Sequence, residues 1–158
     1  MSLMFTNKHV IIAMLVAPLL AIMAWFAVDY FIGERPHAAK QGAAYTLIAK
    51  SNCRYDSGQC DLENADFKLN LRPTSVTSGS IQLEMTSAFP LQSAIVGLVD
   101  DGTPASPSVM SATTDERLHW TTRMPAPAGE NSFIRVAVTA EGATWHAEVP
   151  TVFLFTGN

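Results

Sequence analysis

The feature that most constrains the fold of this chain is an uninterrupted apolar segment near its start. Residues 10–28 read VIIAMLVAPLLAIMAWFAV and contain no charged side chain. At about 1.5 Å per residue such a helix is about 28 Å long, close to the thickness of the hydrocarbon core of a bilayer. The segment, extended by DYFI, therefore predicts one transmembrane helix over residues 10–32 and a lipid bilayer as a partner.

A cleaved secretory signal is the alternative interpretation of this segment. Signal peptides have apolar cores of roughly 7 to 15 residues, followed by a cleavage site of small residues. Here the apolar core is longer, and its end carries the bulky sequence WFAVDYFI. These differences favour an uncleaved anchor.

Four residues mark the predicted membrane anchor: Val10, Pro18, Trp25 and Tyr30. Val10 begins the apolar segment, and Pro18 lies near its middle, where membrane helices tolerate a proline. Trp25 and Tyr30 lie near its second end, and aromatic side chains there suit the level of the lipid headgroups. We expect a short cytoplasmic tail at residues 1–9 and a juxtamembrane linker at residues 33–43.

Beyond the linker, the sequence breaks into short segments in which every second residue is apolar. DFKLNLR at residues 66–72 and SIQLEMTS at residues 80–87 show this alternation, which is typical of half-buried strands. Turn signals separate the segments, among them DDGTP at residues 100–104 and EG at residues 141–142. About nine strands are expected, at residues 44–51, 66–72, 80–87, 91–99, 108–113, 116–124, 132–140, 143–149 and 151–157.

The number and spacing of these strands predict an all-β fold. We expect an immunoglobulin-like antiparallel sandwich over residues 44–158, preceded by the transmembrane helix. Because alternation buries one side of each strand, we expect Trp120 and Trp145 in the core of the sandwich.

The two cysteines of the chain, Cys53 and Cys60, lie in SNCRYDSGQC. Thioredoxin-like sites place two residues between their cysteines and begin a helix there, whereas RYDSGQ is longer and contains the turn signal Asp-Ser-Gly. A disulfide across a loop is the favoured interpretation, with a redox dithiol and a pair of metal ligands as alternatives. Closing so short a loop stabilises a fold by about 2 to 2.5 kcal/mol in the chain-entropy model.

The predicted disulfide also bears on which side of the membrane the domain lies. Basic residues flank both ends of the apolar segment, Lys8 on one side and Arg35 and Lys40 on the other, and do not decide the orientation. Disulfides persist in oxidising compartments. We therefore expect a single-pass protein of a bacterial inner membrane, with a cytoplasmic N-terminus and a periplasmic sandwich.

The charge of the domain argues against nucleic acid as a partner. From Gln41 onward the chain has twelve acidic and seven basic side chains, a net charge of −5. Nucleic-acid phosphates favour a basic surface instead.

Metal binding and catalysis have weak support in the sequence. Copper(I) prefers sulfur and imidazole ligands, and the candidates for such a site are His119, Met124, His146 and Met110. His119 and Met124 are five residues apart, so in a regular strand their side chains face opposite sides. We expect no metal and no cofactor, and because no set of nucleophile, base and orienting group is recognisable, we expect no enzyme.

The layout resembles that of the FixH-like family of membrane-anchored proteins. The resemblance consists of the N-terminal helix, the segment VDYFIGERPHAAKQG after it, and the late sequence TTRMPAPAGENSFIRVAVTAEGATWHAEVP, in which a Met-Pro turn precedes a hydrophobic strand and a strand with a tryptophan. Members of this family accompany the assembly of copper-containing cytochrome oxidases. The resemblance implies a role beside a respiratory oxidase and assigns no metal ligand to this chain.

These observations leave two functional hypotheses. The first is an accessory protein, an assembly factor or a minor subunit of a larger membrane complex, with a respiratory oxidase as the specific candidate. The second is a periplasmic protein that binds or delivers copper.

Overall fold

The computed structural model describes residues 7–32, 39–104, 106–129 and 131–155. The chain forms two compact units, Met1–Pro36 and His37–Asn158. The predicted tail and linker fall partly on residues 1–6 and 33–38, which lie outside the described residues.

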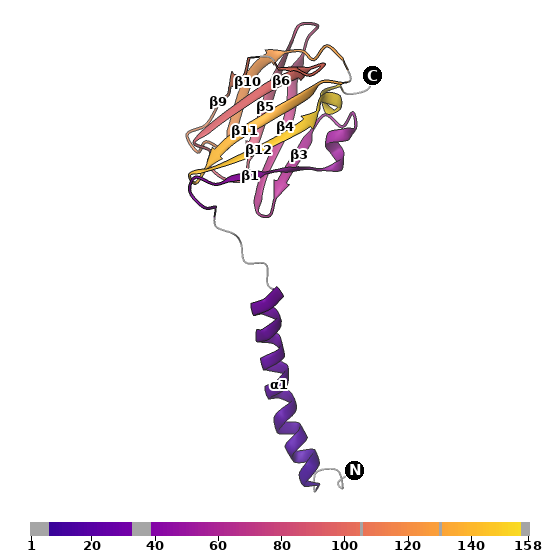
Figure 1. Ribbon diagram of the computed structural model, residues 1–158, viewed down its shortest axis with the longest axis vertical. Coiled ribbons are helices and arrows are strands. Elements are labelled where there is room, and N and C mark those ends of the chain that lie inside the picture. The colour runs from indigo at the N-terminus through magenta and orange to yellow at the C-terminus, as the bar shows by residue number, and fades with distance from the viewer. Residues whose placement is uncertain (1–6, 33–38, 105, 130, 156–158) are drawn as a thin grey trace. The chain divides into compact units, whose positions relative to one another are not determined.

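The first unit contains one long helix, α1 (Lys8–Ile32) (Figure 1). The Asn7 side chain begins it by accepting the backbone N–H of His9 at 3.1 Å, and Pro18 lies within it. Over Lys8–Val28 the mean hydropathy is 2.6, and none of this surface is buried by other parts of the protein. The helix is long and apolar enough to span a membrane, a property that it shares with signal sequences.

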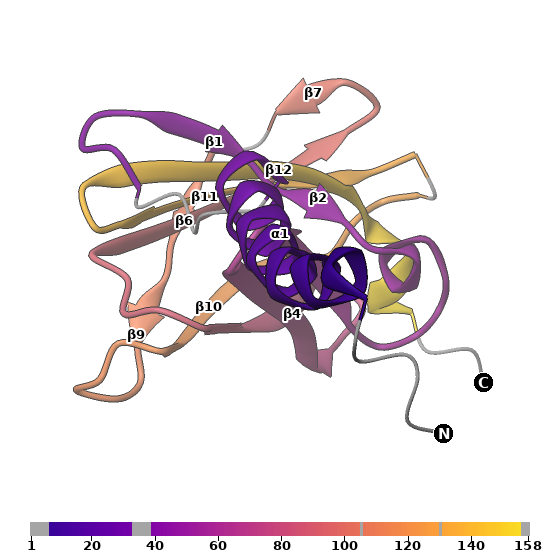
Figure 2. The same cartoon turned by 90° about the horizontal axis from the view of Figure 1, so that it is seen from below.

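The second unit is a sandwich of two six-stranded sheets, so the predicted all-β sandwich after an apolar helix is confirmed (Figures 1 and 2). Sheet A contains, in spatial order, β1 (Ala44–Thr46), β12 (Ala143–Pro150), β11 (Phe133–Ala140), β6 (Ser93–Asp100) and β7 (Thr103–Pro104), with β8 (Ser108–Val109) also paired to β6. Sheet B contains β2 (Ile48–Ala49), β3 (Cys60–Asn64), β4 (Phe67–Val76), β5 (Ser80–Ser87), β10 (His119–Pro125) and β9 (Ser111–Ala112).

The pairing of strands is antiparallel with one exception among the described strands. β1 runs parallel to β12, with Ala44 opposite Thr144 and Thr46 opposite His146. β1 is the first strand after the helix and β12 is the last strand, so this pair brings the two ends of the domain together.

Stacked aromatic rings cross the core between the sheets. Trp145 of β12 stacks on Tyr45 of β1 at a centroid distance of 4.5 Å and on Phe67 of β4 at 4.3 Å, and Phe67 in turn lies 5.9 Å from Phe89. Trp145 and Trp120 are 7% and 4% exposed, so both tryptophans lie in the core as predicted.

Two segments close the open sides of the sandwich by passing from one sheet to the other. The first pairs with sheet A as β1 and with sheet B as β2, and the second pairs with sheet A as β8 and with sheet B as β9. Leu47 and Met110 lie at the two crossing points, and both side chains are buried. The sequence predicts a single strand in each place, at residues 44–51 and 108–113, and the structure divides each of them.

The two turn signals form hairpins. Glu141 and Gly142 join β11 to β12 with φ angles of 52° and 77°, and Asp101 and Gly102 join β6 to β7 with φ angles of 44° and 77°. Two successive positive φ angles are typical of a type I′ turn, whose twist matches that of the flanking strands. The predicted hairpin at residues 141–142 is confirmed.

One other strand prediction is wrong, and one further strand has no counterpart among the predicted ones. The closing segment forms a 3₁₀ helix, η2 (Thr151–Leu154), in place of the strand predicted at residues 151–157, of which 156 and 157 lie outside the described residues. β3 is present but was not predicted, because its inward positions are Cys60 and Leu62 among polar neighbours. A cysteine provides a weaker apolar signal in a sequence than a branched side chain.

Candidate functional site

The two cysteines form the predicted disulfide. Cys53 lies in η1 (Ser51–Arg54) and Cys60 begins β3; their Cα atoms are 4.3 Å apart and both residues are fully buried. No thiol is present in the bonded state, and the buried sulfur atoms are out of reach of a second protein. The disulfide therefore links η1 covalently to β3.

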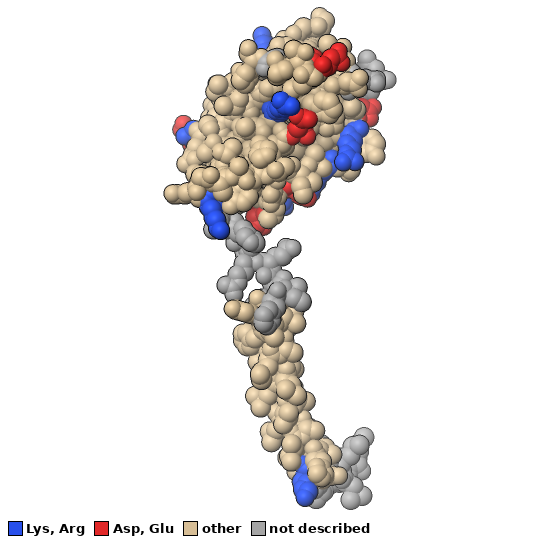
Figure 3. Space-filling model, in the orientation of Figure 1, with Lys and Arg blue, Asp and Glu red and all other residues tan. Residues whose placement is uncertain are grey.

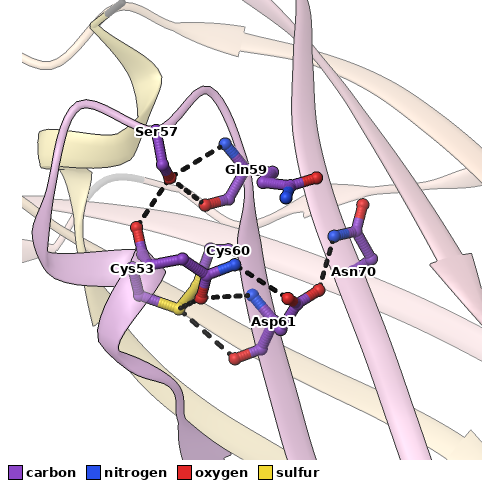
Figure 4. The surroundings of a disulfide bond; sticks show 7 residues. Cys53, Ser57, Gln59, Cys60, Asp61 and Asn70 are labelled. Carbon is purple, nitrogen blue, oxygen red and sulfur yellow. Dashed lines mark hydrogen bonds between the residues drawn. A yellow bond between two sulfur atoms is a disulfide. The ribbon is translucent and has the colours of Figure 1, made fainter.

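Hydrogen bonds hold the residues around the disulfide in place (Figure 4). The carboxylate of Asp61 accepts the side-chain amide of Asn52 at 2.8 Å and that of Asn70 at 2.6 Å. Within the loop, the Ser57 hydroxyl lies 2.7 Å from the carbonyl oxygen of Asn52 and 2.6 Å from that of Gln59. These bonds connect the loop to β3 and β4 and satisfy its polar groups.

The four candidate copper ligands do not converge. Met110 and Met124 are 2% and 3% exposed and fill the core. His119 lies on the outer face of sheet B, with Nδ1 3.4 Å from the Thr86 hydroxyl, and His146 lies on the outer face of sheet A, with Nε2 3.1 Å from the Thr46 hydroxyl. Because β10 pairs regularly with β5, His119 and Met124 face opposite sides of the sheet. The described residues also contain no group of three His, Cys, Asp or Glu side chains placed to hold a metal.

Ser132 and Asp100 form a hydrogen-bonded pair that has a structural explanation. The Ser132 hydroxyl donates to Oδ1 of Asp100, which also accepts the backbone N–H of Ala128 at 3.4 Å. Ser132 is 2% exposed, and its carbonyl oxygen accepts the hydroxyl of Thr151 at 3.2 Å. The pair ties the segment before β11 to β6 and to η2.

The outer face of sheet B is polar and charged. Lys50 pairs with Glu63 at 2.7 Å, and this hydrogen bond together with the negative charge of Glu63 raises the pKa of Lys50. The outward positions of the long strands carry Lys68, Asn70, Arg72, Gln82, Glu84, Thr121 and Arg123. Such a surface is well solvated by water.

The outer face of sheet A is much less polar. Three adjacent strands contribute rows of side chains that the pairing register defines. One row contains His146, Ala137, Ile95 and Val109; the next contains Glu148, Arg135 and Gly97; the third contains Pro150, Phe133, Val99 and Pro104. A fourth row, at the other end of the strands, is polar and contains Thr144, Thr139 and Ser93. Figure 3, in the orientation of Figure 1, shows few charged side chains on the sandwich surface towards the viewer.

A groove of about 460 Å³ lies on this face. Its apolar lining includes Gly97, Ala137, Ile95, Pro104 and Pro107. Arg135 and Glu148 form an ion pair at 2.6 Å on another side of it. Ile95, which lines the groove, and its register neighbour Val109 are 38% and 71% exposed.

The helix also has one distinctive face. Its five alanines, Ala13, Ala17, Ala21, Ala24 and Ala27, fall within an arc of about 120° at 100° per residue, an arc that Leu20 and Val28 share. Large side chains, such as Leu15, Ile22 and Phe26, project from the opposite side. A small-residue face lets a second helix approach closely in a membrane.

Sequence reasoning missed the apolar face of sheet A and the alanine face of α1. The signal for the first is AIVGLV at residues 94–99, which lacks the alternation of a strand with one solvated face. The signal for the second is the four-residue spacing of Ala13, Ala17 and Ala21.

Comparison with known proteins finds no family model that matches this chain and no curated sequence that matches it. One solved structure shows a partial similarity, the "Crystal structure of Br derivative BhCBM56", a carbohydrate-binding module. It is 12% identical, with a TM-score of 0.41 over 56% of this chain and 92% of that chain. A TM-score this low supports no statement about what this chain binds.

Proposed function

We propose that this protein is a single-pass membrane protein that acts as an accessory protein, an assembly factor or a minor subunit of a larger membrane complex. The observation that carries the proposal is the alanine face of α1. A helix that only anchors a domain in lipid has no need of a small-residue face, because lipid tails pack equally well against leucine. A helix that packs against other helices benefits from one.

The length of the linker supports a partner in the same membrane. Eleven residues separate the end of α1 at Ile32 from the start of β1 at Ala44. Even a fully extended peptide of this length spans at most about 40 Å. The sandwich therefore has access to the parts of membrane proteins that project from the bilayer.

The disulfide supports a domain outside the cytoplasm. Both cysteines of the chain are used in it, and such bonds persist where the surroundings are oxidising. We assign the sandwich to the periplasm of a bacterial cell, with the N-terminus of the anchor in the cytoplasm. The resemblance to FixH-like proteins makes a respiratory oxidase the specific complex proposed.

Replacing Ala17 by leucine tests the role of the helix face. The full chain with A17L should still insert into the membrane, because leucine is more apolar than alanine. We expect the amount of membrane complex that co-purifies from gently solubilised membranes to fall by about tenfold, since the larger side chain separates the helices. Quantitative mass spectrometry of the purified material measures this, and haem absorbance shows whether an oxidase is present.

The matched control is Ile22→Phe, which adds volume on the opposite side of α1 and should leave the co-purified complex unchanged. Equal recovery of the complex with both variants would remove the helix face as a contact. A chain that recovers no membrane complex in any form would contradict the proposed function itself.

The compartment is tested by the state of the cysteines. We expect that a thiol-alkylating reagent labels neither Cys53 nor Cys60 when natively isolated protein is denatured without reductant, and labels both after reduction. Intact-mass measurement distinguishes the two states. Two reactive thiols before reduction would contradict both the periplasmic location and the orientation.

A further inference from the structure

The apolar outer face of sheet A is not explained by packing within the described part of the chain. β6 buries Ala94, Val96 and Leu98 in the core, yet it also presents Ile95 outwards with 38% of its surface exposed, whereas Val99 on the same side is only 6% exposed. A strand that is apolar on both faces is typical of a sheet that is covered on both sides. From the shape and charge of this face we infer that a second copy of the same chain covers it.

The shape of the face is compatible with its own copy. Ile95 and Val109, which are directly opposite each other in the register, form an exposed apolar ridge. The groove that Gly97 and Ala137 line borders this ridge at Ile95, and Gly97 is two residues from Ile95 on the same strand. A two-fold axis that lies in the plane of the contact, crosses over β6 between Ile95 and Gly97 and runs perpendicular to the strand places the Ile95 position of each copy opposite the Gly97 position of the other, as an isologous interface requires.

The charge of the face also favours a second copy. The domain carries a net charge of −5 from Gln41 onward, so most of its surface repels another copy. On the strands of sheet A, the outward charged side chains at the groove are Arg135 and Glu148, which neutralise each other at 2.6 Å. Two such faces meet without like-charge repulsion, and Arg135 of one copy has Glu148 of the other as an additional acceptor.

The area of the face fits a contact that depends on the membrane anchor. β12, β11 and β6, with eight residues each, and β8, with two, together offer a flat footprint of roughly 400 Å², from strand spacing and rise. A stable interface buries about 800 Å² of accessible surface per partner, so a contact through this face is smaller than that class. Anchoring in one membrane raises the effective concentration of two copies, so that a contact of this size becomes populated.

Site-specific cross-linking of the full chain in native membranes tests the inference. The engineered thiol in Ala137→Cys is the only free one, because Cys53 and Cys60 are bonded to each other. We expect a short thiol-to-thiol cross-linker to join two copies through residue 137. The same experiment with Ile48→Cys, on the edge of sheet B and 68% exposed, should give no dimer above the background of random encounters.

A second variant tests the ridge. Adding Val109→Glu to Ala137→Cys should reduce the cross-linked dimer by about tenfold or more, because each copy then brings a carboxylate into an apolar contact. Ile48→Glu is the matched control, since the Ile48 and Val109 side chains are 68% and 71% exposed, and it should leave the dimer unchanged. Circular dichroism of each variant confirms that the sandwich is folded.

Three outcomes would overturn the inference: no cross-linked dimer with Ala137→Cys, equal dimer with Ile48→Cys, or dimer that persists with Val109→Glu. Cross-links from residue 137 to another protein alone would assign the face to that partner instead of a second copy. These results are independent of the helix experiment, because Ala17→Leu changes neither sheet A nor the groove.

Discussion

Replacing Trp145 by alanine is expected to lower the free energy of unfolding of the sandwich by about 3 to 5 kcal/mol. The indole contacts Tyr45 on one side and Phe67 on the other, so its loss removes two ring contacts and opens a cavity between β1, β12 and β4. Chemical denaturation followed by circular dichroism measures the change in the full chain solubilised in detergent.

Trp145→Phe separates the volume of the ring from its polar group. The indole Nε1 is buried and has no hydrogen-bond partner among the described residues, so a phenyl ring keeps the stacking and removes a group that is costly to bury. We expect this variant to lose less than about 1.5 kcal/mol. If alanine were tolerated as well as phenylalanine, the ring stack would contribute little to stability.

Replacing Met110 by glutamate is expected to lower the free energy of unfolding by at least about 4 kcal/mol. Met110 is 2% exposed and plugs the point where its segment crosses from sheet A to sheet B. A carboxylate there is buried without a cationic partner. Because small domains are stable by only about 5 to 15 kcal/mol, this loss should move the midpoint of denaturation to a much lower denaturant concentration.

Two matched variants test whether the loss comes from burying a charge at position 110. Val109→Glu, one residue earlier, should change the free energy of unfolding by less than about 0.5 kcal/mol, since Val109 is 71% exposed. Met110→Leu should lose less than about 1.5 kcal/mol, because it conserves apolar volume while it removes the sulfur. A large loss of stability with Met110→Leu would show that the thioether itself contributes to the free energy of unfolding. Met110 would then again be a candidate metal ligand.

Much of the sandwich is predictable from the sequence because solvation acts on single side chains. β4 and β5 alternate between core and solvent, so that Leu69 and Leu83 are buried while Lys68 and Gln82 are not. The hairpin at Glu141 and Gly142 is predictable for another local reason, namely the positive φ angles that its turn requires. The spacing of the cysteines and the turn between them likewise indicated the disulfide.

The parts that sequence reasoning missed depend on contacts between distant residues. Leu47 and Met110 interrupt single predicted strands because each segment closes a gap between two sheets, and no local pattern records where such a gap lies. TVFLF reads as a strand from its apolar residues, but after Pro150 the backbone turns into η2, which buries Phe153 and Leu154 without a ladder of strand hydrogen bonds.

The candidate site shows the same limit. His119, His146, Met110 and Met124 share a chemistry that suits copper, and only the fold shows that two of them fill the core and two lie on opposite outer faces. The apolar face of sheet A is spread over four strands, so each strand contributes only one or two residues to it. Its sequence signal is correspondingly weak.

The pairing of β1 with β12 sets the order in which the domain is completed during synthesis. Thr46 and His146 are in contact although they are one hundred residues apart in the chain. Tyr45 of β1 has no ring to stack on until Trp145 has been synthesised. β1 therefore lacks its partner strand while nearly all of the domain is synthesised, whereas the short loop of Cys53 and Cys60 can already close. The disulfide can therefore form before the final strand pairing, which has to wait for β12.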